Sequence, residues 1–170
     1  SMIEARCKKM LTYKYALKLT KEMPIEEKGI YERLNSNLAD DVNRKLSANL
    51  ITVVRNNTSL LPIRGLAERS IAVVNIGEQS ENEFTRYVKK YAKVDVYSTS
   101  GLLSNQVLSA IKNHDVVIVG VFNHKAIARQ AFAQLKNIPN IVPVFFVNPY
   151  EMAQFKLSLD GLNTLVLGYD

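Results

Sequence analysis

The chain has 170 residues, a length that fits one domain with additional material at an end. It is 47% hydrophobic and 22% charged, as ordinary globular proteins are, and it has no run of about 18 apolar residues to span a membrane. The single cysteine excludes an internal disulfide, and the two histidines lack metal-ligand partners at suitable spacing. We therefore expect no metal site and no membrane span.

The formal net charge of +6 is concentrated at one end of the chain. Residues 1–21 hold six Lys or Arg against one Glu, a net +5, so residues 22–170 carry only +1. A nucleic-acid surface needs basic side chains spread over a face of the folded domain. This distribution instead indicates a solvated helix face, and we expect no nucleic-acid partner.

The first segment has the periodicity of a helix. Apolar residues recur at three- and four-residue intervals between Ile3 and Tyr15, and the helix must end by Pro24. Cys7 lies among these apolar positions and is expected to be a small buried side chain. Residues 22–33 are polar and suit a linker.

A second helix is predicted over residues 34–50, where an apolar residue recurs at every fourth position. Asn35 or Ser36 can cap its start with a side-chain oxygen. The helix runs into the β-branched residues 51–54, which predict a short strand. A turn is predicted at 56–59 and an extended apolar segment at 60–63.

From residue 70 onward, strands and helices alternate. Residues 71–76 are almost wholly apolar, as a strand buried on both faces is, and residues 116–122 predict the central strand most clearly. The order implies an α/β fold: a mostly parallel, doubly wound, flavodoxin-like sheet with helices on both faces, preceded by a helical extension. The other strands are predicted at 94–97, 141–147 (with Pro143 near its start or at an edge) and 164–167, and the helices around 84–91, 103–111, 127–135 and 151–155.

Ligands of open α/β sheets bind at the carboxyl ends of the strands. The residues expected there are the ligand-binding candidates of this chain. His124 also suits the N-terminal part of a helix, and Tyr150 can either stack on a sugar or pack against a neighbouring domain. The candidates are Gly77, Asn123, His124, Asn148 and Tyr150.

Several cofactor chemistries are excluded by the residues themselves. The turn after the first parallel strand has one glycine and the acidic Glu78, which does not suit a dinucleotide, and no P-loop is present. A phosphoacceptor domain would need acidic residues where Asn75 and Asn123 stand. We expect no cofactor.

Catalytic groups are also missing from the pattern. No serine lies in a G-x-S-x-G turn, and His114 is expected to be a loop residue at the amino end of a strand. Glycoside hydrolysis needs two carboxylates that flank one bond. No such pair is evident among Glu78, Glu81, Glu83 and Glu151, which suit solvated loops or first helical turns.

Four segments, taken in order, resemble family 3 glycoside hydrolases. Residues 50–56 followed by Leu60-Leu61-Pro62-Ile63 resemble the entry to the second domain of that family, and residues 71–77 and 114–119 resemble two of its strands. The helix that contains Cys7 to Tyr15 is similar to the one that closes the preceding barrel. Asn148-Pro149-Tyr150 and Leu167-Gly168-Tyr169 resemble the β-N-acetylglucosaminidase branch.

The resemblance implies a parent enzyme that hydrolyses β-linked sugars, N-acetylglucosaminides among them, with retention through a glycosyl-enzyme intermediate. It implies that residues 1–33 end a catalytic barrel and that 34–170 form an accessory domain, truncated after its last strand. The nucleophilic aspartate then lies upstream, and no catalytic residue is assigned here. The barrel and a carbohydrate are the implied partners, and the parent is expected to be periplasmic or extracellular.

Two further hypotheses remain open. The chain could be an independent flavodoxin-like module that binds a small ligand at Gly77, Asn123 and Asn148, or a self-sufficient hydrolase. The first helix, if separated from a barrel, would expose an apolar stripe that could drive homodimerisation.

Overall fold

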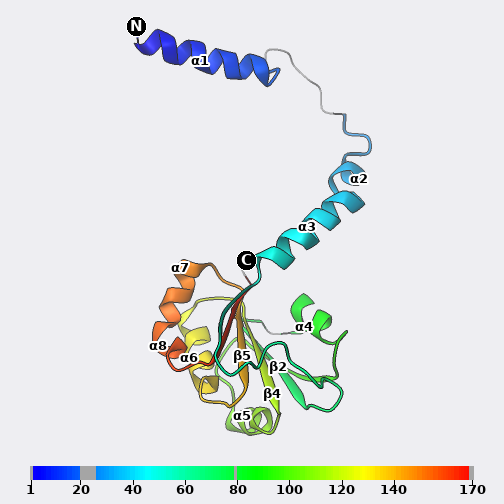
Figure 1. Cartoon of the computed structure of the whole chain (residues 1–170), viewed down its shortest axis with the longest axis vertical. Helices are drawn as coiled ribbons and strands as arrows, with labels where there is room; N and C mark the ends of the chain where they lie inside the picture. Colours follow the sequence, from blue (N-terminus) through cyan, green and yellow to red (C-terminus); the bar gives the residue numbers. More distant parts are fainter. Residues whose placement is uncertain (1, 20–25, 79, 169–170) are drawn as a thin grey trace. The chain divides into compact units, whose positions relative to one another are not determined.

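The computed structural model describes residues 2–19, 26–78 and 80–168. The chain divides into two compact units, Ser1–Asn43 and Arg44–Asp170. Figure 1 traces the elements of both along the sequence.

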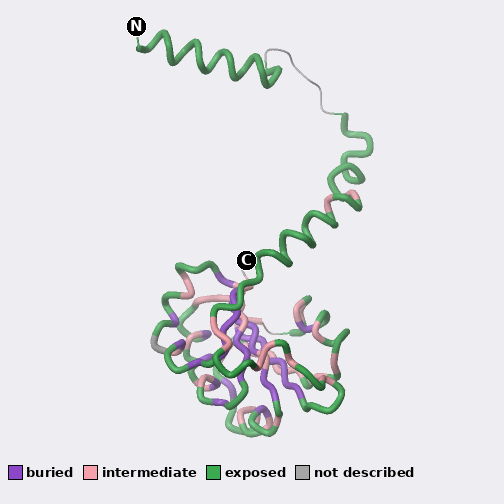
Figure 2. The backbone as a smooth tube through the Cα atoms, viewed as in Figure 1, coloured by how far each residue is buried: buried purple, intermediate pink, exposed green. Residues whose placement is uncertain are grey.

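The helices of the N-terminal unit have almost no cover. Helix α1 (Met2–Ala16) ends well before Pro24, as predicted, but none of its residues is buried (Figure 2). The expectation of a buried Cys7 is therefore wrong, because no described residue packs over the apolar side chains of α1. The periodicity predicted the helix correctly but could not supply the surface that would bury it.

The predicted linker contains a short helix, α2 (Ile30–Leu34), so residues 30–33 are not extended; residues 22–25 lie outside the described residues. Asn35 ends α2 by donating its backbone N–H to the carbonyl of Tyr31. Helix α3 (Asn37–Leu50) then starts afresh, with Ser36 Oγ accepting from the N–H of Ala39 at 3.3 Å. Of the two candidate caps, Ser36 caps α3.

The second unit is built on a six-stranded sheet with the order β1-β6-β5-β4-β2-β3. Neighbours from β6 to β3 pair in parallel, whereas β1 pairs antiparallel with β6 at the edge. Numbered among themselves, the parallel strands have the order 2-1-3-4-5 of flavodoxin-like folds, as predicted. The strands are β1 (Thr52–Asn56), β2 (Ile71–Ile76), β3 (Val94–Thr99), β4 (Val116–Val121), β5 (Ile141–Phe145) and β6 (Thr164–Leu167).

Pro143 lies near the start of an interior strand, which agrees with the first of the two expected positions and excludes an edge. It is the third residue of β5 and stands opposite Val119 of β4. On the other side, β5 pairs with β6 only from Val144 onward. Pro143 is therefore beyond the paired part of that ladder, where a missing N–H is tolerated.

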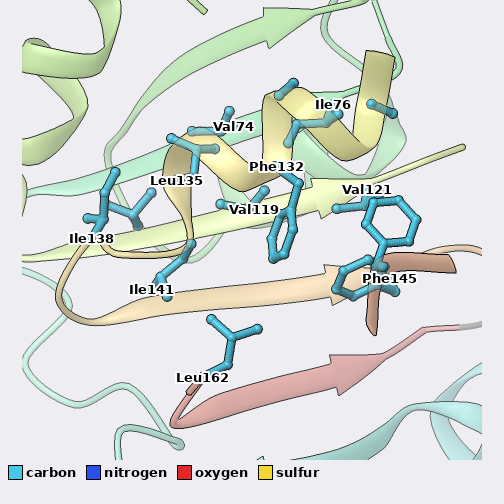
Figure 3. Packing of buried hydrophobic residues seen from close by; sticks show 14 of the residues in the cluster. Val74, Ile76, Val119, Val121, Phe132, Leu135, Ile138, Ile141, Phe145 and Leu162 are labelled. Atoms are coloured by element: carbon cyan, nitrogen blue, oxygen red, sulfur yellow. The ribbon is translucent and has the colours of Figure 1, made fainter. Parts of the chain in front are cut away.

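One face of the sheet carries the main hydrophobic core. Side chains that alternate along β2, β4, β5 and β6 pack there against the helices that follow β3, β4 and β5 (Figure 3). Phe132 and Phe145 form an edge-to-face pair with ring centroids 5.2 Å apart in this core. The covering elements are α5 (Asn105–Lys112), α6 (Ala126–Leu135), α7 (Pro149–Met152), the 3₁₀ turn η1 (Ala153–Phe155) and α8 (Lys156–Leu159).

The opposite face has less cover. Ile71, Val116, Val142 and Val166 pack there under the segment 60–66. Toward the carboxyl end of this face the short helix α4 (Glu83–Val88) is held by buried polar groups. Asn75 Nδ2 donates to Thr85 Oγ1 at 2.8 Å and to Ser98 Oγ at 3.1 Å.

A charged loop contact fixes the amino end of β4. The backbone N–H and the hydroxyl of Ser70 both donate to Asp115 Oδ2 at 2.8 Å, and the Asp115 N–H returns a bond to Ser70 Oγ at 3.0 Å. The hydrogen bond from the Ser70 backbone, followed by that from its hydroxyl, lowers the pKa of Asp115 from its ordinary 3.8. The ionised carboxylate is thus favoured in the folded state.

This contact predicts a pH dependence of stability. A carboxyl pKa that is depressed on folding contributes stability above the unfolded-state value, and the contribution disappears as pH falls through the folded value. We expect Asp115→Asn to flatten the loss of unfolding free energy below about pH 4, the ordinary range for Asp, measured by urea denaturation from pH 6 to pH 2. Asp160→Asn, which removes an exposed loop carboxylate, is the control; equal flattening by both variants would contradict the assignment.

Candidate functional site

The candidate residues cluster at one edge of the sheet. Gly77 follows β2, Asn123 and His124 follow β4, and Asn148 and Tyr150 follow β5. Strands β2, β4 and β5 are parallel, so their carboxyl ends share this edge. From β2 the chain adds β3 on one side of the sheet and then β4 on the other, so the strand order reverses between β2 and β4. Open α/β sheets bind ligands at such a switch point.

The space above Gly77 is occupied by a protein side chain. Gly77 has φ +100°, and its N–H donates to the carbonyl of Thr99 at 2.8 Å. The Asn123 side chain lies against it, with Nδ2 3.5 Å from the Gly77 carbonyl oxygen and Oδ1 accepting from the N–H of Lys125. A Cβ on residue 77 would overlap Asn123 Nδ2. The structure thus brings Gly77 and Asn123 together as packing partners.

His124 is paired with a carboxylate. Its Nδ1 lies 3.1 Å from Glu151 Oε1, and the two side chains are 42% and 31% exposed. Glu151 is held in turn because its N–H donates to Asn148 Oδ1 at 2.9 Å, which makes Asn148 the cap of α7 with Pro149 as its first residue. The contact with Glu151 leaves Nε2 of the imidazole available to a partner.

A second bridge joins the same two loops. Arg129 Nη1 donates to the His124 carbonyl at 3.2 Å and to Gln154 Oε1 at 2.6 Å. The loop after β4 is therefore tied to the α7–η1 segment at two points. The bridge fixes the position of His124 relative to Asn148 without using either candidate side chain.

Tyr150 extends from this edge into solvent, with 90% of its surface exposed. An exposed tyrosine ring offers an apolar face for a sugar and a hydroxyl for hydrogen bonding. Of the five candidates, Tyr150 and His124 present groups to solvent, Asn148 caps a helix, and Gly77 and Asn123 pack on each other.

Sequence reasoning missed the role of Glu151, which it placed among solvated first-turn carboxylates. The signal was indirect: His124 and Glu151 follow adjacent strands, but the adjacency of β4 and β5 depends on the winding of the sheet. Glu81 and Glu83 form ion pairs around α4: Glu81 pairs with Lys89 and Glu83 with Arg86, each at 2.7 Å.

The opposite edge holds His114, in the turn before β4 as predicted. Its Nε2 lies 2.9 Å from Asp95 Oδ2. The Ser70 hydroxyl is directed to Asp115, so it is not activated by His114. Within residues 2–19, 26–78 and 80–168, no three His, Cys, Asp or Glu side chains are grouped to hold a metal. No described helix has the length and apolar character of a membrane span.

Comparison with solved structures identifies the fold. The chain matches part of a fungal multi-domain GH3 β-N-acetylglucosaminidase with a TM-score of 0.63 and 19% identity, over 79% of this chain and 16% of the other. The chain shares the fold of a part of that enzyme. A β-glucosidase from Listeria innocua matches at 0.63 and 17%, over 85% and 25% of the two chains. The β-glucoside phosphorylase BglX matches at 0.58 and 14%, over 92% and 31%.

The chain therefore spans about a third or less of these enzymes' lengths. Its fold resembles a domain of glycoside hydrolase family 3 chains, in agreement with the sequence resemblance. No family model matches the sequence, and a search of curated proteins found no match.

The packing of Asn123 on Gly77 predicts an unequal effect of two glycine substitutions. Gly77 and Gly161 both have positive φ, but a Cβ on Gly161 would meet no atom within 4 Å. We expect Gly161→Ala to cost about 1 kcal/mol of unfolding free energy from backbone strain and Gly77→Ala about 1–3 kcal/mol more from the displaced Asn123. Chemical denaturation measures both. Equal losses of unfolding free energy would show that the Asn123 side chain moves aside at no cost, contrary to the prediction.

Proposed function

We propose that this chain is the accessory α/β domain of a glycoside hydrolase that acts on β-linked sugars, and that it packs beside a separate catalytic barrel. The fold match carries the proposal: 79–92% of the chain superposes on a minor part of enzymes titled as a β-N-acetylglucosaminidase, a β-glucosidase and a β-glucoside phosphorylase. N-acetylglucosaminides are the proposed substrates because residues 148–150 and 167–169 resemble that branch.

We assign residues 1–33 to the end of the barrel and 34–170 to the accessory domain. The exposure of α1 supports this division: Ile3, Met10 and Leu11 are 74%, 58% and 64% exposed. Apolar side chains on an uncovered helix are best explained by a partner surface.

In this proposal the domain shapes the sugar site and leaves the bond cleavage to the barrel. Tyr150 provides a ring to stack on a sugar, and His124, oriented by Glu151, provides a hydrogen-bonding nitrogen. Both lie on the edge where a ligand of this fold would be met. The alternative of a small ligand bound at Gly77, Asn123 and Asn148 has less support, since these side chains are used in packing and capping.

The first test compares activities. We expect the chain alone to release no aryl group from aryl β-N-acetylglucosaminide or aryl β-glucoside, and a longer polypeptide in which these residues follow a catalytic barrel to hydrolyse one of them. The preferred substrate identifies the branch. Turnover by the chain alone would place the catalytic pair within it and contradict the proposal.

A variant of the longer enzyme tests the sugar contact. Loss of a stacking ring worth about 0.5–1.5 kcal/mol raises KM about 2- to 10-fold, so Tyr150→Ala should raise KM and leave kcat nearly unchanged. Gln106→Ala, at an exposed position of α5, is the matched control and should change neither constant. An unchanged KM in Tyr150→Ala would remove Tyr150 from the site while leaving the domain assignment intact.

A further inference from the structure

The less covered face of the sheet carries an apolar hollow of about 770 Å³ near its carboxyl end. It lies between α4 and strands β4, β5 and β6, on the side opposite the main core. Ser47, Ile51, Glu78 and Glu83 form part of its wall, and its other side chains are apolar or aromatic. These are Phe84, Tyr87, Phe122, Val144, Phe146 and Val166.

Close packing of aromatic rings forms the floor of the hollow. Phe122 and Phe146 stack with an interplanar angle of 2° and centroids 4.9 Å apart, and Phe84 meets both rings edge-on. The rings lie over Gly120 and Gly168, where an added Cβ would approach Phe122 and Phe146 to 2.8 and 2.7 Å. The rings of the floor therefore pack closely on one another, yet all three remain only half-buried.

The apolar surface continues beyond the hollow. Val53 of β1 stands opposite Val166 in an antiparallel pair, so its side chain lies on the same face of the sheet. Val53 is 52% exposed and Ile51, in the wall of the hollow, is 55% exposed. An apolar surface this extended is unusual on a protein that acts as a monomer and marks an interface.

Helix α3 bears an apolar stripe of the kind that fills such a hollow. Leu38, Val42, Leu46 and Leu50 recur every four residues and are 73%, 46%, 56% and 49% exposed. Asp40, Asp41, Asn43 and Arg44 lie between them in sequence and occupy the other faces, so α3 is amphipathic. None of its residues is buried.

We propose that the chain self-associates, with the apolar stripe of α3 from one copy seated in the hollow of a second copy and the reciprocal contact made by the other α3. An amphipathic helix in an apolar groove is a common recognition mode. The exchange is closed and two-fold, because each copy offers the same two surfaces. The charges agree as well: Lys45 beside the stripe is cationic, and Glu78 in the wall of the hollow is anionic.

The connection between α3 and β1 selects a second copy as the occupant. Only Ile51 separates the end of α3 at Leu50 from the start of β1 at Thr52. Helix-to-strand connections in α/β units take 2–6 residues. One residue does not allow a helix to turn back across the sheet that it enters, and of α3 only Ser47 contributes to the wall of the hollow in the same chain, so we infer that the stripe is seated in the hollow of a second copy.

Size-exclusion chromatography with light-scattering detection measures the molar mass of the unmodified chain and so tests the association. We expect twice the 19.2 kDa of one chain. Leu46→Glu should raise the dimer dissociation constant about tenfold or more, since burying a leucine contributes about 1.5–3 kcal/mol and burying a carboxylate opposes association. Leu11→Glu, the same change on exposed α1, should leave the constant unchanged. A monomeric wild-type chain, or dimers lost only in Leu11→Glu, would overturn the proposal.

Disulfide trapping locates the contact. Cys7 is the only cysteine, so Cys7→Ser chains that carry one new cysteine each, with tags of different mass, can be mixed and oxidised. Ala39→Cys on the stripe side should link to Tyr87→Cys at the hollow, and Ala48→Cys on the opposite side of α3 should not. Gln106→Cys on α5 controls for random collision. Equal yields from all pairs would contradict the assigned surfaces even if the protein is dimeric.

Discussion

The parallel pairing of β2 with β4 is the constraint on which the rest of the second unit depends. Its register sets Asn75 opposite Gly120 and Ile76 opposite Val121, so the two strands end together and their following loops meet. Gly77 and Asn123 are in contact for that reason. The same register places Gly120, which has no side chain, under the aromatic rings. It also places the buried Asn75 where its side chain can bond to Thr85 and hold α4. An unbonded amide at this depth would cost several kcal/mol.

The strands could be predicted from the sequence because their signal is local. The apolar runs at 71–76 and 116–122 match β2 and β4 closely, since strands buried on both faces need apolar residues at every position. The ends of the strands and their neighbours in the sheet were harder to predict, because both depend on residues far away in the sequence. Pro143 indicated either a position near the start of its strand or an edge strand, and the pairing of β5 with β6, which begins only at Val144, decides for the former. The periodicity at 3–15 predicted α1 but not its exposure, which depends on what packs against it.

The candidate site shows the same limit. Parallel strands that all carry polar residues after their carboxyl ends predict a shared edge, and all five candidates are found there. What each side chain does at that edge was not predictable, because it follows from strand order and loop geometry. His124 meets Glu151 only because β5 adjoins β4, and Asn148 is used as a cap because Glu151 supplies an N–H three residues on. The sequence could therefore place the candidate residues at one edge of the sheet. Only the contacts in the structure show which of these side chains are used in packing and which are exposed.

The polar edge and the apolar hollow have different physical origins, so their proposed roles are separable. Tyr150, on α7, and His124, on the loop after β4, are exposed because they lie beyond the sheet, where exposure of a polar or amphipathic group costs little. Phe122, Val144 and Phe146 are incompletely covered because, among the described residues, only α4 and the segment 60–66 lie over the second face. Burial of apolar surface is favourable by about 25 cal/mol per Å², so the hollow favours association with another apolar surface. This driving force does not select a sugar. A partner in the hollow contacts Phe122 and Phe146, where the loops after β4 and β5 begin, whereas the His124–Glu151 and Arg129–Gln154 bridges hold the later parts of these loops together.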